Sequence, residues 1–127
     1  MTTTELAYRL STLTADEILR IADDLRADLD SADGEVAWWR ATIVVSGTLR
    51  RHHLTRQAGI AAHAATSAVV DAAKGAGIDH DRRDDVTAVA RAAAEVARVL
   101  VAGGEVTLPG TVAETLLHPW HDVVPAA

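Results

Sequence analysis

Apolar side chains recur at helical spacing from Thr14 onward. In the segment 14–29 they follow one another at intervals of three and four residues, and acids and arginines lie between them. This stripe predicts an amphipathic helix with one buried face. Thr14 and Glu17 form the T-x-x-E pattern of a capping box, in which each side chain binds a backbone N–H at the helix start. The turn-forming segment 30–34 is expected to end this helix, and Asp33 to cap the next. The buried stripe consists of Ile18, Ala22, Leu25 and Leu29.

The second predicted helix, residues 34–51, is apolar almost all round. Its β-branched cluster at 42–45 has only modest helix propensity, but the apolar run is long for a strand and has no second run to pair with. Packing commonly overrides so weak a preference, so we predict a helix. Trp38 and Trp39 are adjacent, and neighbouring helical residues point about 100° apart. One of the two indoles is therefore expected to face another helix, a partner chain or a ligand.

Two further helices are predicted after a polar junction. The third begins near Thr55 and ends at the glycines of segment 75–77. The fourth has a cap at Asp84 or Asp85 and ends at glycines 103–104. Both carry mostly small residues on their apolar stripes, which allows helices to approach closely. The stripes consist of Ala58, Ala62, Ala65, Val69 and Ala72, and of Val86, Val89, Ala93, Val96 and Leu100.

The two ends of the chain are expected to be additions to these helices. Residues 1–13 are predicted to form an N-terminal arm or a short helical turn. Residues 105–127 predict an appendage with a second capping box, Thr111 with Glu114, and one or two helical turns that end at Pro119.

The whole pattern predicts an all-α fold. No internal repeat or linker divides residues 1–127, so we expect one domain. Four long helices with short connections indicate a four-helix up-and-down bundle, here with a short C-terminal helix and an extended tail. A content of 49% hydrophobic and 24% charged residues is typical of a soluble globular protein.

Charge and composition limit the classes of partner, chemistry and location that the chain can have. A net charge of −6 makes nucleic acid an unlikely partner. The absence of cysteine excludes disulfides, thiol chemistry and Cys-ligated zinc. The first ten residues lack a secretory pattern, and the apolar run 36–49 is shorter than the roughly 20 residues that span a bilayer. We therefore expect a cytoplasmic protein without a membrane segment.

A histidine and carboxylate group near the C-terminus is the candidate metal site. Glu114 and His118 lie four residues apart on one helical face, and His121 follows, so three N/O ligands are available. The Glu-x-x-His spacing of dimetal bundles does not occur. Alternatively, His118 ends the helix and Trp120 folds back as an apolar plug. We predict no cofactor, and a metal-binding bundle, possibly an enzyme, is the alternative function.

Five basic residues cluster at the junction of the second and third helices. Such a group can bind an anion, a phosphate or an acidic partner. Alternatively it offsets the segment 14–35, which carries eight acids and two arginines. The candidate anion-binding residues are Arg50, Arg51, His52, His53 and Arg56.

Arg56, Gln57 and His63 span eight residues in a pattern that resembles the Arg-polar-His motif of HEPN-type helical ribonucleases. The resemblance implies that the Arg and His orient a 2′-hydroxyl and stabilise a phosphorane. The family has Asn or Asp after the arginine, where this chain has Gln57. The alternative is that His63 is a partly buried structural residue.

Association is the function that the sequence favours. An alanine-rich bundle buries little area per helix, and small domains of this kind often gain stability by oligomerising. Tryptophan is enriched at binding hot spots, although the same residues can be core of a stable monomer. We predict a self-association module that forms a homodimer, or a module that binds another protein, in either case without catalytic activity. The interface candidates are Trp38, Trp39, Ile60, His63 and Val70.

Overall fold

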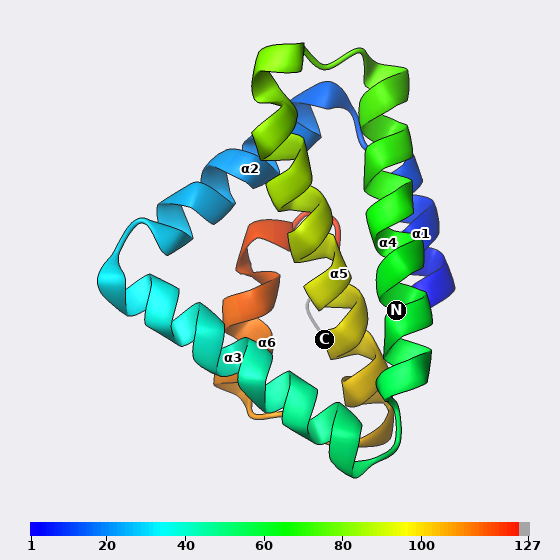
Figure 1. Cartoon of the computed structure of the whole chain (residues 1–127), viewed down its shortest axis with the longest axis vertical. Helices are drawn as coiled ribbons and strands as arrows, with labels where there is room; N and C mark the ends of the chain where they lie inside the picture. The colour runs from blue at the N-terminus through cyan, green and yellow to red at the C-terminus, as the bar shows by residue number, and fades with distance from the viewer. Residues whose placement is uncertain (125–127) are drawn as a thin grey trace.

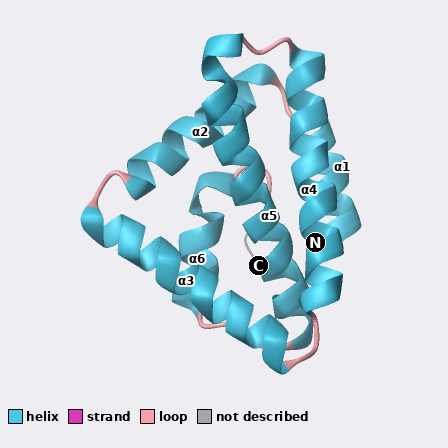
Figure 2. Cartoon of the chain, viewed as in Figure 1, coloured by secondary structure: helices cyan, strands magenta, loops and turns pink. Residues whose placement is uncertain are grey.

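The computed structural model describes residues 1–124, and this part of the chain is helical without strands (Figure 2). The all-α prediction is therefore confirmed. The α-helices are α1 (Thr3–Ser11), α2 (Ala15–Leu29), α3 (Ala32–Arg51), α4 (Thr55–Ala76), α5 (Arg83–Glu105) and α6 (Gly110–Leu117). Two 3₁₀ turns, η1 (His80–Arg82) and η2 (His118–Trp120), precede α5 and follow α6. None of these helices is long and apolar enough to cross a membrane.

The arrangement differs from the expected four-helix up-and-down bundle. The described residues form six α-helices, and α2, α3 and α5 outline a triangle in Figure 1, with α6 behind it. α4 and α5 form an antiparallel hairpin, and α1 packs on α4. The turn between α3 and α4, in which His53 has a φ of 56°, directs α3 away from this hairpin. α3 packs mainly on α6.

The apolar residues form two cores. The larger one joins α1, α2, α4, α5 and the segment after α6. The smaller one joins α3, the start of α4, the end of α5, and α6. α5 contributes to both, because Val96 faces the first and Val99 the second. α3 is thus held by the smaller core alone.

Both ends of the chain take part in the larger core. In the expected arm 1–13, α1 buries Leu6 and Leu10, each 0% exposed. In the expected appendage 105–127, Trp120 is also 0% exposed and is among the largest fully buried side chains. The end of the expected extended tail, 125–127, lies outside the described residues.

The helix starts confirm one predicted cap and correct three. Thr14 and Glu17 form the capping box that begins α2. Ser31 caps α3 in place of Asp33, because the helix begins two residues earlier than predicted and the Ser31 hydroxyl accepts the N–H of Gly34. A Cβ at Gly34 would lie 2.0 Å from the Asp28 carbonyl oxygen, so this close turn requires glycine.

The caps expected for the last two helices do not form. α5 begins at Arg83 without a side-chain cap, and Asp85 instead accepts hydrogen bonds from Arg82 and Arg26. The Arg82 hydrogen bond holds the pKa of Asp85 below its ordinary value. α6 begins at Gly110, so Thr111 already lies inside the helix and caps no N–H.

Candidate functional site

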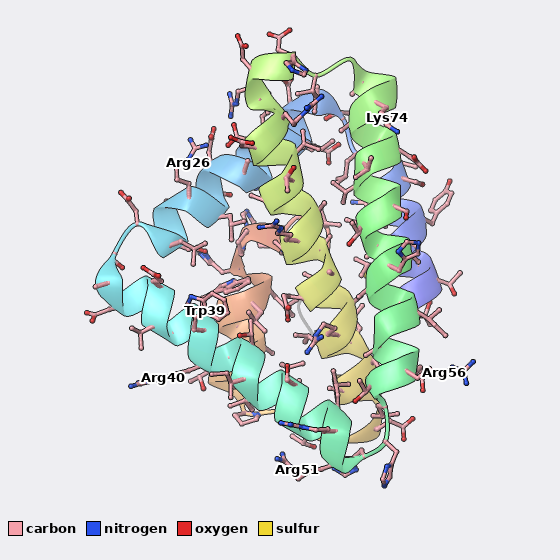
Figure 3. All side chains as sticks on the ribbon, viewed as in Figure 1. Arg26, Trp39, Arg40, Arg51, Arg56 and Lys74 are labelled. Atoms are coloured by element: carbon pink, nitrogen blue, oxygen red, sulfur yellow. The ribbon has the colours of Figure 1, made fainter. Side chains whose placement is uncertain are left out.

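Trp38 and Trp39 point in different directions, as their adjacent positions require. Trp38 is half-buried and packs against the smaller core. Trp39 is 58% exposed, and Figure 3 shows it on the edge of α3 that faces the inside of the triangle. Their rings meet edge to face with centroids 6.0 Å apart. Trp39 is therefore the tryptophan that the cores leave uncovered.

Trp39 belongs to an exposed apolar line on α3. Ile43, one turn further on, is 67% exposed, and Val36, one turn earlier, is also exposed. Val44 extends the line on one side. We call Val36, Trp39, Ile43 and Val44 the α3 surface. The opposite face of the same helix buries Ala41, Val45 and Leu49 in the smaller core. α3 is thus apolar on two faces, and the described structure covers one of them.

The α3 surface ends at a position without a side chain. Gly47 lies one turn after Ile43, and a Cβ added there would approach a guanidinium nitrogen of Arg51 to 3.3 Å. On the α5 side, Arg98 donates a hydrogen bond to the Ser46 hydroxyl. Arg98 also lies beside Glu95, with 3.5 Å between Nε and Oε2. Burial raises the pKa of Glu95, and the Arg98 charge opposes that rise.

The two ends of α3 carry opposite charges. Asp33 and Glu35 are exposed at its N-terminal end, and Arg50 and Arg51 are exposed at its C-terminal end. This polarity favours the helix, because acids and bases then lie near the positive and negative ends of its dipole. Within residues 1–124, none of these four side chains has an ion-pair partner. The α3 surface thus lies between an acidic and a basic end.

The five candidate anion-binding residues are all exposed in the α3–α4 turn and its flanks. Arg51 donates to the Thr48 hydroxyl at 3.2 Å and so folds back along its own helix, whereas Figure 3 shows Arg56 pointing away from the protein. No ion pair joins this group to the acids of 14–35 in the described residues. Three of those acids, Asp23, Asp24 and Asp28, pair instead with Arg20, Arg26, Arg82 and His118. The other basic residues of the turn are Arg50, His52 and His53.

Two of the three candidate metal ligands, His118 and His121, have other partners. His118 Nδ1 lies 2.7 Å from Asp28 Oδ2, and this contact raises the pKa of His118. His121 Nδ1 lies 3.0 Å from the His118 carbonyl oxygen. No three His, Asp or Glu side chains among residues 1–124 are placed to hold a metal ion, and Glu114 lies beside His118 only in a shallow groove. His118 therefore connects α2 to the C-terminal turn.

The Asp28 contact was not predictable from the sequence. Asp28 and His118 lie 90 positions apart, and neither position belongs to a motif that names the other. The sequence gives a weak indication of the half-buried pair of Glu95 and Arg98. Glu95 is the one acid in the segment 86–104, and it lies beside the apolar stripe of α5.

The remaining interface candidates lie on α4. Ile60 is 65% exposed and lines a shallow groove between α1 and α4. His63 is exposed, whereas Val70 is half-buried against the larger core. Arg56 and His63 are both exposed, two turns apart, and no hydrogen bond joins them in the described structure. α1 has no contact with α3, so the Ile60 groove is separate from the α3 surface.

Comparisons with known proteins return no match: no protein-family model, no curated protein and no solved structure is significantly similar to this chain. Function is therefore inferred from the side chains that the fold exposes, pairs or buries. Among these, the α3 surface combines a tryptophan, aliphatic side chains and uncompensated charges within one helix.

Proposed function

We propose that this chain is a protein–protein interaction module that associates with a second copy of itself, or with another protein, through the α3 surface. The observation that carries the proposal is the line of Trp39 and Ile43, 58% and 67% exposed, on a helix that already buries its other face. Single exposed apolar residues are ordinary, whereas a contiguous apolar patch marks an interaction site. Tryptophan is also enriched among the residues that dominate binding energies.

Burial of this surface supplies a driving force for association. Covering one large aliphatic side chain contributes about 1.5–3 kcal/mol relative to exposure. Trp39 and Ile43 lie one turn apart, so a single partner helix can cover both. Self-association is the mode we propose first, because a small alanine-rich core gains stability when a further apolar face is buried.

The test measures molecular mass by light scattering over a wide concentration range. We expect the wild-type chain to shift from 13.4 kDa toward twice that mass as its concentration rises. Trp39→Ala and Ile43→Asp are expected to weaken association by about 30-fold or more, the effect of losing a hot-spot residue. Association that both substitutions leave unchanged would place the interface elsewhere.

Two control variants separate docking from folding. Ile60→Asp changes a side chain of similar exposure in the α1–α4 groove, and it is expected to leave association unchanged. Trp38→Ala removes a side chain that packs on the smaller core, so it is expected to lower the free energy of unfolding. Trp39→Ala should leave that free energy of the monomer within about 0.5 kcal/mol, as is usual for exposed positions.

A further inference from the structure

We infer that the partner of the α3 surface is a second copy of this chain, bound as an antiparallel pair of α3 helices around a two-fold axis at Ile43. This inference rests on the proposed function and adds the partner, the orientation and the register. It follows from the order of apolar, small and charged residues along one exposed helix face. In an antiparallel pair, Trp39 meets the small residue Gly47, and the acidic end of the helix meets the basic end of its copy.

The apolar residues set the centre of the pair. Ile43 is among the most exposed large apolar side chains of the protein, and it lies midway between the exposed positions Val36 and Arg50 of this helix. If Ile43 packs against its own copy, antiparallel helices bring Trp39 opposite Gly47 of the second copy. Val36 then lies opposite Arg50 of the second copy. Such a contact is isologous, because the same patch serves both chains.

Gly47 provides space for the indole. A side chain of the size of tryptophan needs a recess in the facing helix, and glycine leaves that position open. Gly47 lies on the same line as Trp39 and Ile43, and it is half-buried. A Cβ there would already approach Arg51 to 3.3 Å, so a larger residue would both fill the recess and displace this guanidinium.

The charges select the antiparallel orientation. An antiparallel pair brings the exposed acids Asp33 and Glu35 near the exposed bases Arg50 and Arg51 of the second copy. At about 100° per residue, Glu35 and Arg50 lie on one flank of the seam. Asp33 and Arg51 lie on the other. A parallel pair would place like charges together at both ends, which is unfavourable. Such rim pairs determine orientation and partner choice more than affinity.

The same charges favour a second copy over an unrelated partner. None of the four residues has an ion-pair partner within residues 1–124, although the acids of α2 are largely paired within the chain. An unrelated partner would need its own acidic end, apolar centre and basic end in the matching order. A second copy has them by symmetry.

Cysteine cross-linking tests the register, because the natural chain has no cysteine. Ile43→Cys is expected to form a disulfide with its own copy under mild oxidation, since the two positions meet at the axis. Val36→Cys is expected not to cross-link with itself, because antiparallel copies of Val36 lie roughly 21 Å apart along the seam. A mixture of Val36→Cys and Arg50→Cys chains should give the mixed disulfide dimer.

Charge reversal tests the orientation without a covalent bond. Glu35→Arg and Arg50→Glu are each expected to weaken the dimer roughly tenfold, because each puts like charges at two symmetric places. The double variant should regain most of the wild-type affinity in an antiparallel pair. A parallel pair would not be rescued. Circular dichroism confirms that each variant remains helical.

The outcomes separate this inference from the proposed function. A wild-type chain that stays monomeric at every concentration overturns the pairing. A dimer that Trp39→Ala disrupts, but in which Val36→Cys cross-links to itself, overturns the antiparallel register and leaves the docking role of α3 intact. A dimer that neither Trp39→Ala nor Ile43→Asp weakens overturns both.

Discussion

Neighbouring side chains of α3 meet opposite environments, because each step along a helix turns by about 100°. Trp38 packs on the smaller core, and Trp39 is left exposed beside it. The same helix also buries Thr42 and Thr48. Their hydroxyls donate to the Trp39 and Val44 carbonyl oxygens at 2.7 and 2.9 Å, so the helix itself satisfies these buried groups.

The contact of Asp28 with His118 predicts a pH dependence. The Asp28 hydrogen bond raises the pKa of His118 in the folded protein, and the charges of Asp28, Asp24 and Glu114 act in the same direction. The contact therefore stabilises the fold fully below the unfolded-state pKa of histidine. That stabilisation is lost as the pH rises through the raised folded-state pKa. Because the pair is largely exposed, we expect an effect of about 0–1 kcal/mol.

Asp28→Asn tests this contact. We expect the pKa of His118, followed by NMR titration, to fall toward its ordinary value. The pH dependence of urea unfolding between the two pKa values should diminish in parallel. Asp30→Asn is a control, since Asp30 is exposed and has no ion pair in the described structure. An unchanged titration of His118 in Asp28→Asn would show that the contact does not persist in solution.

At the level of elements, the same short motif has two outcomes. T-x-x-E occurs at Thr14 and at Thr111, and only the first is a capping box. Pro109 occupies the N-cap position of α6, and the helix begins at Gly110, so Thr111 is two residues too late to cap it. A local pattern indicates that a cap is possible, whereas the chain path before it determines where the helix begins.

This difference predicts unequal costs for matched substitutions. Thr14→Ala should lower the free energy of unfolding by about 0.5–2 kcal/mol, the usual cost of losing an N-cap. Thr111→Ala should change it by less than about 0.5 kcal/mol, because that side chain caps nothing. Urea unfolding of the two variants measures both values. Equal costs would contradict the helix start at Gly110.

On the scale of the whole molecule, the charges are divided unevenly. The chain has a net charge of −6, yet the exposed α3–α4 turn is basic. The acids of α2 find partners at the start of α5 and in the C-terminal turn, including Arg82 and His118. The basic turn therefore remains available to a surface outside the chain, and acidic residues at the other end of α3 offer such a surface in a second copy.

This division predicts how salt affects association. Exposed charge pairs are screened over about 8 Å at physiological ionic strength. We expect the wild-type dimer to weaken when salt is raised. In the double variant Glu35→Gln and Arg50→Gln, the apolar seam remains but the salt response should be smaller. Sedimentation equilibrium at low and high salt measures both. Equal responses of the two proteins would show that these charges do not face each other.

Much of the local structure could be predicted from the sequence. The helical segments, the capping box at Thr14 and the divergence of the two tryptophans all follow from periodicity and helix geometry. Periodicity records which face of a helix is apolar. It does not record which element covers that face, so the packing of α1 in the larger core and of α3 on α6 could not be predicted.

The sequence by itself determined the all-α class, the positions of the long helices and the need for Trp38 and Trp39 to face different surroundings. Local hydrogen bonding and the 3.6-residue repeat are sufficient for these properties. The tertiary structure alone decided that Trp38 is the one covered, that His118 pairs with Asp28, and that α3 keeps an exposed apolar face between opposite charges. These depend on contacts between residues far apart in the chain, which only the completed packing brings together.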